Sequence, residues 1–184
     1  RAAPYVRAAA RLGGVPLVVA HEWSRGAPPT TSRRWADRVL DPGTRYVATS
    51  NAHRDALVAQ GAGRRRIAVV HSGIDVDAFA PGEPVASRAA LGLPVDRPLV
   101  LVPARLHPMK AHVDLVTAVA LLAAARPDVL VVCAGDGPLR PVLPPLARAA
   151  GVGTAFRFVG QQLDMARLYS ACDVVALSSR IEGL

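Results

Sequence analysis

The chain has 184 residues, of which 51% are hydrophobic and 20% are charged; this balance excludes an intrinsically disordered protein. The formal net charge is +8, so nucleic acid, an anionic membrane surface and phosphate-bearing small molecules are all candidate partners. The one tight basic run, Arg64-Arg65-Arg66, has no aromatic residues for base stacking, which argues against nucleic acid, and no stretch has the roughly 18 apolar residues of a membrane span.

The first half of the chain alternates strand-length apolar runs with helical patterns, which is typical of a parallel sheet with crossover helices. The pattern predicts, in chain order, a strand Val15–Ala20, a helix around Ser32–Leu40, a strand Tyr46–Thr49, a helix to about Gln60 capped by Ser50 or Asn51, and a strand Ile67–Val70. A polar stretch beginning at His21 follows the first strand.

A Pro/Gly-rich stretch then breaks the pattern and predicts a domain boundary between about Pro81 and Pro98. The domains are expected to be 1–85 and 86–184. In the second domain we predict four strands: Leu99–Pro103, Asp128–Ala134, Ala155–Val159 and Val174–Leu177. We also predict three helices: one over about Ala111–Ala125, a proline-interrupted one between Pro138 and about Ala150, and one over Met165–Ser170. The chain starts at Arg1 without a Met and ends just after an apolar run, so we expect a fragment with both domains incomplete.

Ligands of open parallel sheets bind outside the carboxyl ends of the strands. Arg105 and Lys110 follow the strand 99–103, and Lys110 is the one Lys among 22 basic residues. A planar guanidinium and a compact ammonium suit a diphosphate, and a helix N-terminus after Lys110 and another after Pro138 would add backbone N–H donors. Glu182 at the last strand exit could accept hydrogen bonds from sugar hydroxyls.

Several segments resemble the family 4 glycosyltransferases of the two-domain GT-B fold. They are HSGIDVDAF at 71–79, VPARLHPMKAHVDLVTAVALL at 102–122, VVCAGDGPLR at 131–140, RFVGQ at 157–161 and LYSACDVVALSSRIEGL at 168–184. The resemblance implies an α/β protein with two doubly wound, Rossmann-like domains, the first on the acceptor side and the second binding the donor. It covers roughly residues 15–184.

The resemblance also implies roles for individual residues. Arg105 and Lys110 match the pair that grips the donor phosphates, and Glu182 matches the first Glu of a Glu-x7-Glu motif whose second Glu would lie beyond Leu184. His21 matches an active-site histidine of the first domain. The implied donor-binding residues are Gly135, Gly137, Phe158, Gly160 and Ser179. The glycine-rich loop usual in the first domain of the family is missing here.

Each of these residues also has an ordinary structural explanation. His21 could be a hydrogen-bonded residue at a strand end, and Gly135-Asp136-Gly137 an ordinary tight turn. His107 and His112 flank Lys110, but polar loops often carry histidine, and we weight both toward structure. The Gly-x-Gly spacing does not continue as a dinucleotide fingerprint because Arg140 takes the place of the third glycine, which disfavours an NAD-binding domain.

The resemblance therefore predicts glycosyl transfer from a nucleoside-diphosphate sugar, with retention of configuration, to a sugar, lipid or small-molecule acceptor. No metal or other cofactor is expected, because a cationic clamp would replace the divalent ion. Alternatives are a non-catalytic nucleotide-sugar-binding module or inactive fragment, and charge-driven nucleic-acid binding. Two cysteines, Cys133 and Cys172, in apolar strand-like contexts indicate buried reduced thiols and hence a cytoplasmic protein, for which peripheral contact with the inner face of the membrane stays open.

Overall fold

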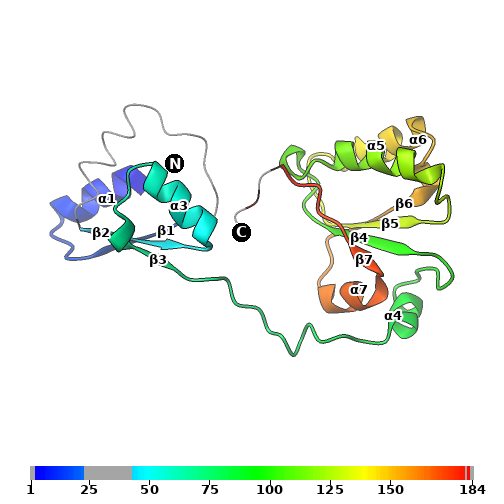
Figure 1. Cartoon of the computed structure of the whole chain (residues 1–184), viewed down its shortest axis with the longest axis horizontal. Coiled ribbons are helices and arrows are strands. Elements are labelled where there is room, and N and C mark those ends of the chain that lie inside the picture. Colours follow the sequence, from blue (N-terminus) through cyan, green and yellow to red (C-terminus); the bar gives the residue numbers. More distant parts are fainter. Residues whose placement is uncertain (1–2, 23–42, 181, 183–184) are drawn as a thin grey trace. The chain divides into compact units, whose positions relative to one another are not determined.

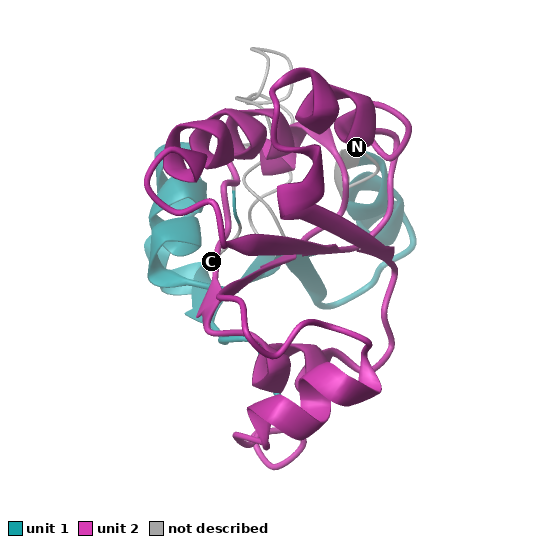
Figure 2. Ribbon diagram, turned by 90° about the vertical axis from the view of Figure 1, so that its right-hand side faces the viewer, with its two compact units in different colours: residues 1–74, 182–184 teal, residues 75–181 magenta. Residues whose placement is uncertain are grey.

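The computed structural model describes residues 3–22, 43–180 and 182. The chain divides into two compact units, residues 75–181 forming the second and the remainder the first (Figure 2). The division lies before the predicted boundary because the intervening segment packs on the second unit. The ring of Phe79 meets that of Tyr169 edge-on at 5.9 Å, and the Gly82 N–H donates to Ser170 Oγ at 3.2 Å.

The first unit contains a three-stranded parallel sheet in the order β1-β2-β3. Its elements are α1 (Ala3–Leu12), β1 (Val18–Glu22), β2 (Thr44–Ala48), α3 (Asn51–Ala59), a 3-10 turn Arg64–Arg66 and β3 (Ile67–Val69) (Figure 1). The capping prediction is confirmed, since Ser50 Oγ accepts the His53 N–H at 3.1 Å. The predicted helix over 32–40 lies outside the described residues. Helix α1, which precedes the first predicted element, was not predicted.

The two helices described in the first unit, α1 and α3, pack on one face of its sheet (Figure 1). The core of this unit consists of Tyr46, Ala48 and Leu57, and Leu57 comes from α3. The buried Arg7 of α1 donates from Nη1 to the hydroxyl of Tyr46 at 2.7 Å, so α1 approaches the same side chain.

The second unit is a four-stranded, all-parallel sheet in the order β6-β5-β4-β7. Its elements are α4 (Pro84–Ala90), β4 (Leu99–Pro103), a 3-10 turn Pro108–Lys110, α5 (His112–Ala123), β5 (Leu130–Ala134), α6 (Leu143–Ala149), β6 (Phe156–Gly160), α7 (Met165–Ala171) and β7 (Val174–Val175). Helices α5 and α6 cover one face and α4 and α7 the other (Figure 1). The α/β, doubly wound architecture predicted for this half is confirmed.

Alternation along the central strands explains how both faces of the sheet are buried. In β5, Leu130 and Val132 point to the core shared with α7, whereas Val131 and Cys133 point to the core shared with α5 and α6. A continuous apolar run is what a strand buried on both faces requires. Both faces of this central strand are therefore covered by helices, and a ligand site of the second unit is expected at the carboxyl ends of the strands.

Two local predictions for the second unit need correction. Helix α4 is not expected from the sequence, because the Pro/Gly-rich stretch before it breaks the pattern, but proline also fits the first turn of a helix, and Pro84 is the first residue of α4. The helix predicted directly after Pro138 begins only at Leu143, since the chain first forms hydrogen-bonded turns such as Arg140 N–H to the Gly137 carbonyl at 2.9 Å. No helix in the described part of the chain is long and apolar enough to cross a membrane.

Candidate functional site

The carboxyl ends of β4, β5 and β6 are joined by backbone hydrogen bonds between the loops that follow them. The Ala104 N–H donates to the Ala134 carbonyl at 3.1 Å, Leu106 N–H to Asp136 O at 3.0 Å, and Gly135 N–H to Gly160 O at 2.7 Å. Because the strands are parallel, these loops share one edge of the sheet. The sequence prediction that the strand exits converge is thus confirmed for this unit.

Glycine is needed at positions 135 and 137 for this loop packing. Both residues have positive φ, 151° and 153°. A Cβ at Gly135 would overlap the carbonyl oxygen of Ala104, and one at Gly137 would lie 2.6 Å from the carbonyl oxygen of Leu106. The two glycines therefore allow the loop after β5 to lie directly against the loop after β4.

A groove of about 440 Å³ opens at this edge. It is lined by Pro103, Ala104, Arg105, Ala134, Gly135, Asp136, Gln161, Gln162, Met165 and Tyr169. Arg105 is exposed, and its guanidinium makes no hydrogen bond or ion pair with the rest of the described chain. It is therefore available to pair with an anion, the interaction for which a guanidinium is best suited. The contributions of Met165 and Tyr169, from α7, were not predicted, because helical periodicity does not show which helix borders a strand exit.

Lys110 ends the 3-10 turn that separates β4 from α5. The turn begins at His107, whose Nδ1 accepts the Met109 N–H at 3.3 Å, so His107 has a structural role as the capping residue. Ala111 then adopts a left-handed conformation, φ 50°, and α5 starts at His112. Lys110 is half-buried and lies next to the positive end of the helix dipole, which makes this turn suitable for an anion.

His112 is buried beneath this turn, with 1% of its surface exposed. Neither ring nitrogen has a hydrogen-bond partner among the described residues. Burial lowers the pKa of His112, and the nearby Lys110 charge lowers it further. The imidazole is therefore neutral near pH 7, and His112 is not an additional cation for a ligand.

The segment after β7 attaches to the turn that carries Lys110. Ser178 Oγ donates to the Lys110 carbonyl at 2.8 Å, and the Arg180 N–H donates to the Met109 carbonyl at 3.0 Å. Ser179, a predicted donor-binding residue, lies between these contacts, and its buried Oγ has no hydrogen-bond partner within the described chain. The structure thus brings Ser179 and Lys110 together.

Phe158 does not line the Arg105 groove. Its ring stacks on Phe156, with centroids 5.9 Å apart, and the guanidinium carbon of Arg140 lies 5.6 Å from its centroid. Arg140 Nη2 also donates to the Phe158 carbonyl at 3.2 Å. The sequence does not predict this contact of Arg140, because the two residues lie 18 positions apart and meet only in the folded sheet.

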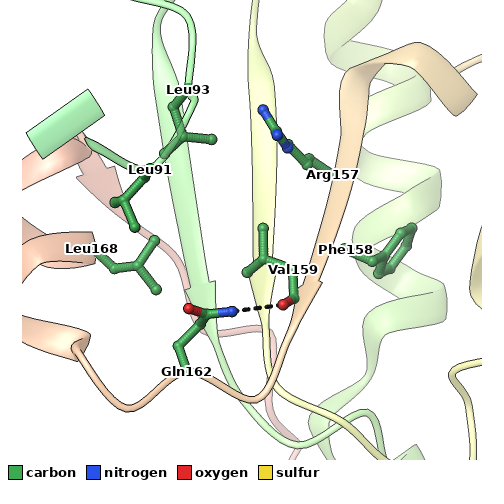
Figure 3. A pocket seen from close by; sticks show the side chains of 7 residues that line it. All are labelled: Leu91, Leu93, Arg157, Phe158, Val159, Gln162 and Leu168. Atoms are coloured by element: carbon green, nitrogen blue, oxygen red, sulfur yellow. Dashed lines mark hydrogen bonds between the residues drawn. The ribbon is translucent and has the colours of Figure 1, made fainter. Parts of the chain in front are cut away.

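Phe158 instead helps to line a second pocket of about 320 Å³ (Figure 3). The other lining residues are Leu91, Leu93, Arg157, Val159, Gln162 and Leu168. Gln162 borders both pockets, and its Nε2 donates to the Val159 carbonyl at 2.7 Å. Arg157 Nη1 donates to the Gly92 carbonyl at 2.6 Å, so the side chains of Arg157 and Gln162 each make a hydrogen bond within the protein.

His21 and Glu182 are not in the same unit as Arg105 and Lys110. His21 lies inside β1, opposite Val47, and is exposed; the prediction that it follows the strand is corrected, because β1 extends to Glu22. Glu182 is exposed and is grouped with the first unit. The residues described together in the second unit are Arg105, Lys110, Gly135, Gly137, Phe158, Gly160 and Ser179.

Residues 86–184 match the family model for glycosyl transferases group 1. Among curated proteins, the D-inositol 3-phosphate glycosyltransferases of Mycobacterium bovis and Mycobacterium tuberculosis are 35% identical over 196 aligned residues, which include 99% of this chain and 38% of each relative. The chain therefore spans about 38% of the length of these relatives.

Solved structures of similar fold support the architecture. The Anabaena protein HepE in complex with UDP superposes with a TM-score of 0.81 at 23% identity, over 96% of this chain and 50% of that one. Sucrose-phosphate synthase from Thermosynechococcus elongatus gives 0.71 at 21% identity, over 97% and 54%. These matches confirm the predicted GT-B fold. Since the family model covers more than half of the residues, the chain belongs to the glycosyl transferases group 1 family.

Proposed function

We propose that the second unit binds the diphosphate of a nucleoside-diphosphate sugar and that the protein transfers its sugar with retention of configuration. The observation that carries this proposal is the position of Arg105 and Lys110 in successive segments after β4, one beside the groove and the other at the start of α5. Anions bind at such edges of parallel sheets. The Anabaena structures with UDP and with UDP-glucose come from proteins of this fold.

In this proposal the groove beside Arg105 holds the nucleoside and the turn at Lys110 holds the phosphates. Charge builds up on the leaving diphosphate as the glycosidic bond breaks. A guanidinium and an ammonium placed there stabilise that charge more in the transition state than in the ground state, which lowers the barrier. Two cations can supply the charge that a divalent ion would otherwise provide, so we propose that catalysis needs no metal and is insensitive to EDTA.

Roles for the remaining predicted residues follow from the family resemblance. Glu182 would orient the donor sugar, and His21 would hydrogen-bond it near the reacting carbon. Gly135 and Gly137 would keep the backbone close to the donor, in addition to the loop packing described above. The backbone of Gly160, whose carbonyl accepts the Gly135 N–H at the edge of the groove, would lie near the base, whereas Phe158 does not line this groove and is given no donor contact. Ser179 Oγ has an unused hydrogen-bonding capacity that a bound donor could satisfy.

The proposal is tested by thermal shift of the full-length protein with UDP-glucose, UDP-N-acetylglucosamine, GDP-mannose and ADP-glucose. A ligand present at 100 times its Kd stabilises by about 2.7 kcal/mol, so the true donor should raise Tm clearly above the others. Turnover is then measured as release of the nucleoside diphosphate. Lys110→Ala should cut turnover by roughly 10²- to 10³-fold, the usual cost of removing one transition-state charge contact.

The matched control is Arg126→Gln, which removes a cation paired on the surface with Asp128 outside the strand-exit loops. This variant should behave as the wild type. No shift with any donor, or wild-type turnover of Lys110→Ala, contradicts the proposal. Donor binding without any turnover favours instead the non-catalytic nucleotide-sugar-binding module.

For the acceptor, the names of the mycobacterial relatives suggest the first compound to try. These proteins are D-inositol 3-phosphate glycosyltransferases, and we propose D-inositol 3-phosphate as the first acceptor in the assay. A product found by mass spectrometry, with the anomeric configuration read by NMR, tests both the acceptor and retention. We also propose a cytoplasmic location, with or without peripheral membrane contact, which cell fractionation at low and high salt would test.

A further inference from the structure

Arg180 and Asp114 connect two segments that come from distant parts of the chain. The guanidinium of Arg180 donates to the carboxylate of Asp114 through Nη2 at 2.9 Å and through Nε at 3.3 Å. Asp114 lies in the first turn of α5, two residues after His112. Arg180 lies in the segment after β7, two residues before Glu182.

Within the described chain, this ion pair and two hydrogen bonds hold the same two segments together. The hydrogen bonds are the Arg180 N–H to Met109 O bond and the Ser178 Oγ to Lys110 O bond. In both bonds the acceptor is a backbone carbonyl oxygen of the turn that ends in Lys110. The backbone of residues 178–180 is therefore held to the backbone that carries the proposed phosphate-binding ammonium.

The ion pair alone is too exposed to contribute much stability. The side chains of Arg180 and Asp114 are 69% and 54% exposed, and such pairs are typically worth little for folding. Its geometry is nevertheless that of a fork, in which two N–H groups meet one carboxylate, and this geometry fixes direction as well as distance. A contact of this kind is better suited to hold a segment in place than to stabilise the fold.

Glu182 lies close enough along the chain to be controlled by this attachment. Two residues span at most about 7 Å, so fixing Arg180 limits the volume that the carboxylate of Glu182 can sample. A displacement of about 1 Å in a reacting complex can reduce the rate by roughly 10²-fold. Small changes in the attachment would therefore appear in turnover before they appear in stability.

We propose that the Arg180–Asp114 pair is a positioning device, which holds residues 178–180, the segment that leads to Glu182, on the turn that carries Lys110. This inference rests on the proposed function for the roles of Glu182 and Lys110. Arg180 acts through its neighbours and does not touch the donor. The attachment therefore affects kcat through the position of the segment that leads to Glu182, without contributing a group that contacts the donor.

The test uses Asp114→Asn, Arg180→Gln and the double variant in the full-length protein, with the fastest donor of the panel above. Each single variant should lower kcat by about three- to tenfold, and the double variant should be no worse than either, because all three remove one shared contact. The donor KM and the Kd for the corresponding nucleoside diphosphate should change less than about twofold. Asp114→Glu, which keeps the carboxylate, should retain most of the activity.

Hydrogen–deuterium exchange gives a readout that does not depend on turnover. The peptide covering residues 178–184 should exchange faster in both single variants and as in the wild type in Asp114→Glu. The control pair is Arg126–Asp128, also an exposed Arg–Asp contact, whose variants Arg126→Gln and Asp128→Asn should leave kcat and this peptide unchanged.

Two results would overturn the inference. If Arg180→Gln weakens nucleoside-diphosphate binding while Asp114→Asn does not, Arg180 contacts the donor directly. If neither variant changes kcat or exchange while Lys110→Ala abolishes turnover, the pair is an ordinary surface contact and the proposed function stands. Failure of the proposed function is separate, since it would show as wild-type turnover of Lys110→Ala or as no donor in the panel.

Discussion

The guanidinium of Arg88 in α4 is held by both carboxylate oxygens of Asp173, at 2.9 and 2.8 Å. Arg88 is 7% exposed and lies against the core shared by α4 and α7. Its Nε donates to the Ala171 carbonyl at 2.7 Å, and Asp173 Oδ2 accepts the Leu99 N–H at 2.7 Å. One ion pair therefore joins α4, the end of α7 and the starts of β4 and β7.

This relationship predicts that Asp173→Ala destabilises the second unit. The substitution leaves a buried guanidinium and the Leu99 N–H without their acceptor, and hydrogen bonds to charged groups are worth about 1.5–3 kcal/mol each. Because Asp173 is about half-exposed, water can replace part of the loss, and we expect a decrease of about 2 kcal/mol in the free energy of unfolding. Urea denaturation measures it. Asp128→Ala, which removes a carboxylate from an exposed pair, is the control and should leave the urea midpoint the same as that of the wild type.

Gly137→Ala should also destabilise the protein and, if the proposed function holds, reduce turnover. The added Cβ would lie 2.6 Å from the Leu106 carbonyl oxygen, on a residue with φ 153°, and strain of this kind costs about 1–3 kcal/mol. The loop after β4, which carries Arg105, would have to move. Gly63→Ala is the matched control, because its Cβ would meet only the flexible Arg66 side chain at 3.8 Å. A Gly137→Ala protein as stable as Gly63→Ala would contradict the loop packing described here.

Because His112 is buried, the stability of the folded protein should depend on pH. Its pKa in the folded protein is lowered from 6.5 by burial and by Lys110, so below pH 6.5 the unfolded state binds more protons than the folded state. Stability therefore falls as the pH decreases through this region. His112→Leu removes this contribution, and because neither ring nitrogen has a partner in the described structure, it breaks no hydrogen bond.

The measurement is the change in Tm between pH 7.5 and pH 5.5. Between these two pH values, we expect Tm to decrease less for His112→Leu than for the wild type, and the two proteins to have similar Tm at pH 7.5. Val113→Leu, a substitution at the exposed residue that follows His112 in α5, serves as the control and should lose as much Tm between pH 7.5 and pH 5.5 as the wild type. If Tm decreases as much or more in His112→Leu, the lowered pKa of His112 is not the cause of the loss of stability at pH 5.5.

The two cysteines should be poorly reactive in the folded protein. Burial raises the pKa of Cys133 to about 12 and that of Cys172 to about 11, so almost no thiolate, the reactive form, exists at pH 8. Iodoacetamide labelling followed by mass spectrometry should show slow modification at pH 8 and rapid modification of both in urea. Cys172, which is only half-buried, should react first; fast labelling of Cys133 in the native protein would show that the β5 core is not closed.

Much of the second unit could be predicted because its signals are local. Strand Leu99–Pro103 is observed with the predicted bounds, since a strand buried on both faces needs an unbroken apolar run. Helix α4 was missed because a proline at 84 both ends one pattern and starts another. Similarly, β1 extends through His21, because strand pairing with β2 continues past the last apolar residue.

The sequence by itself determined the parallel α/β class, the strand exits and the cationic pair Arg105 and Lys110, because periodicity and residue type are properties of short segments. Only the tertiary structure decided that position 137 has to be glycine because the Leu106 carbonyl lies so close, that Phe158 lines a different pocket from Arg105, and that Arg180 pairs with Asp114. These contacts join residues far apart in the chain, and their geometry depends on how loops from different strands pack at one edge of the sheet.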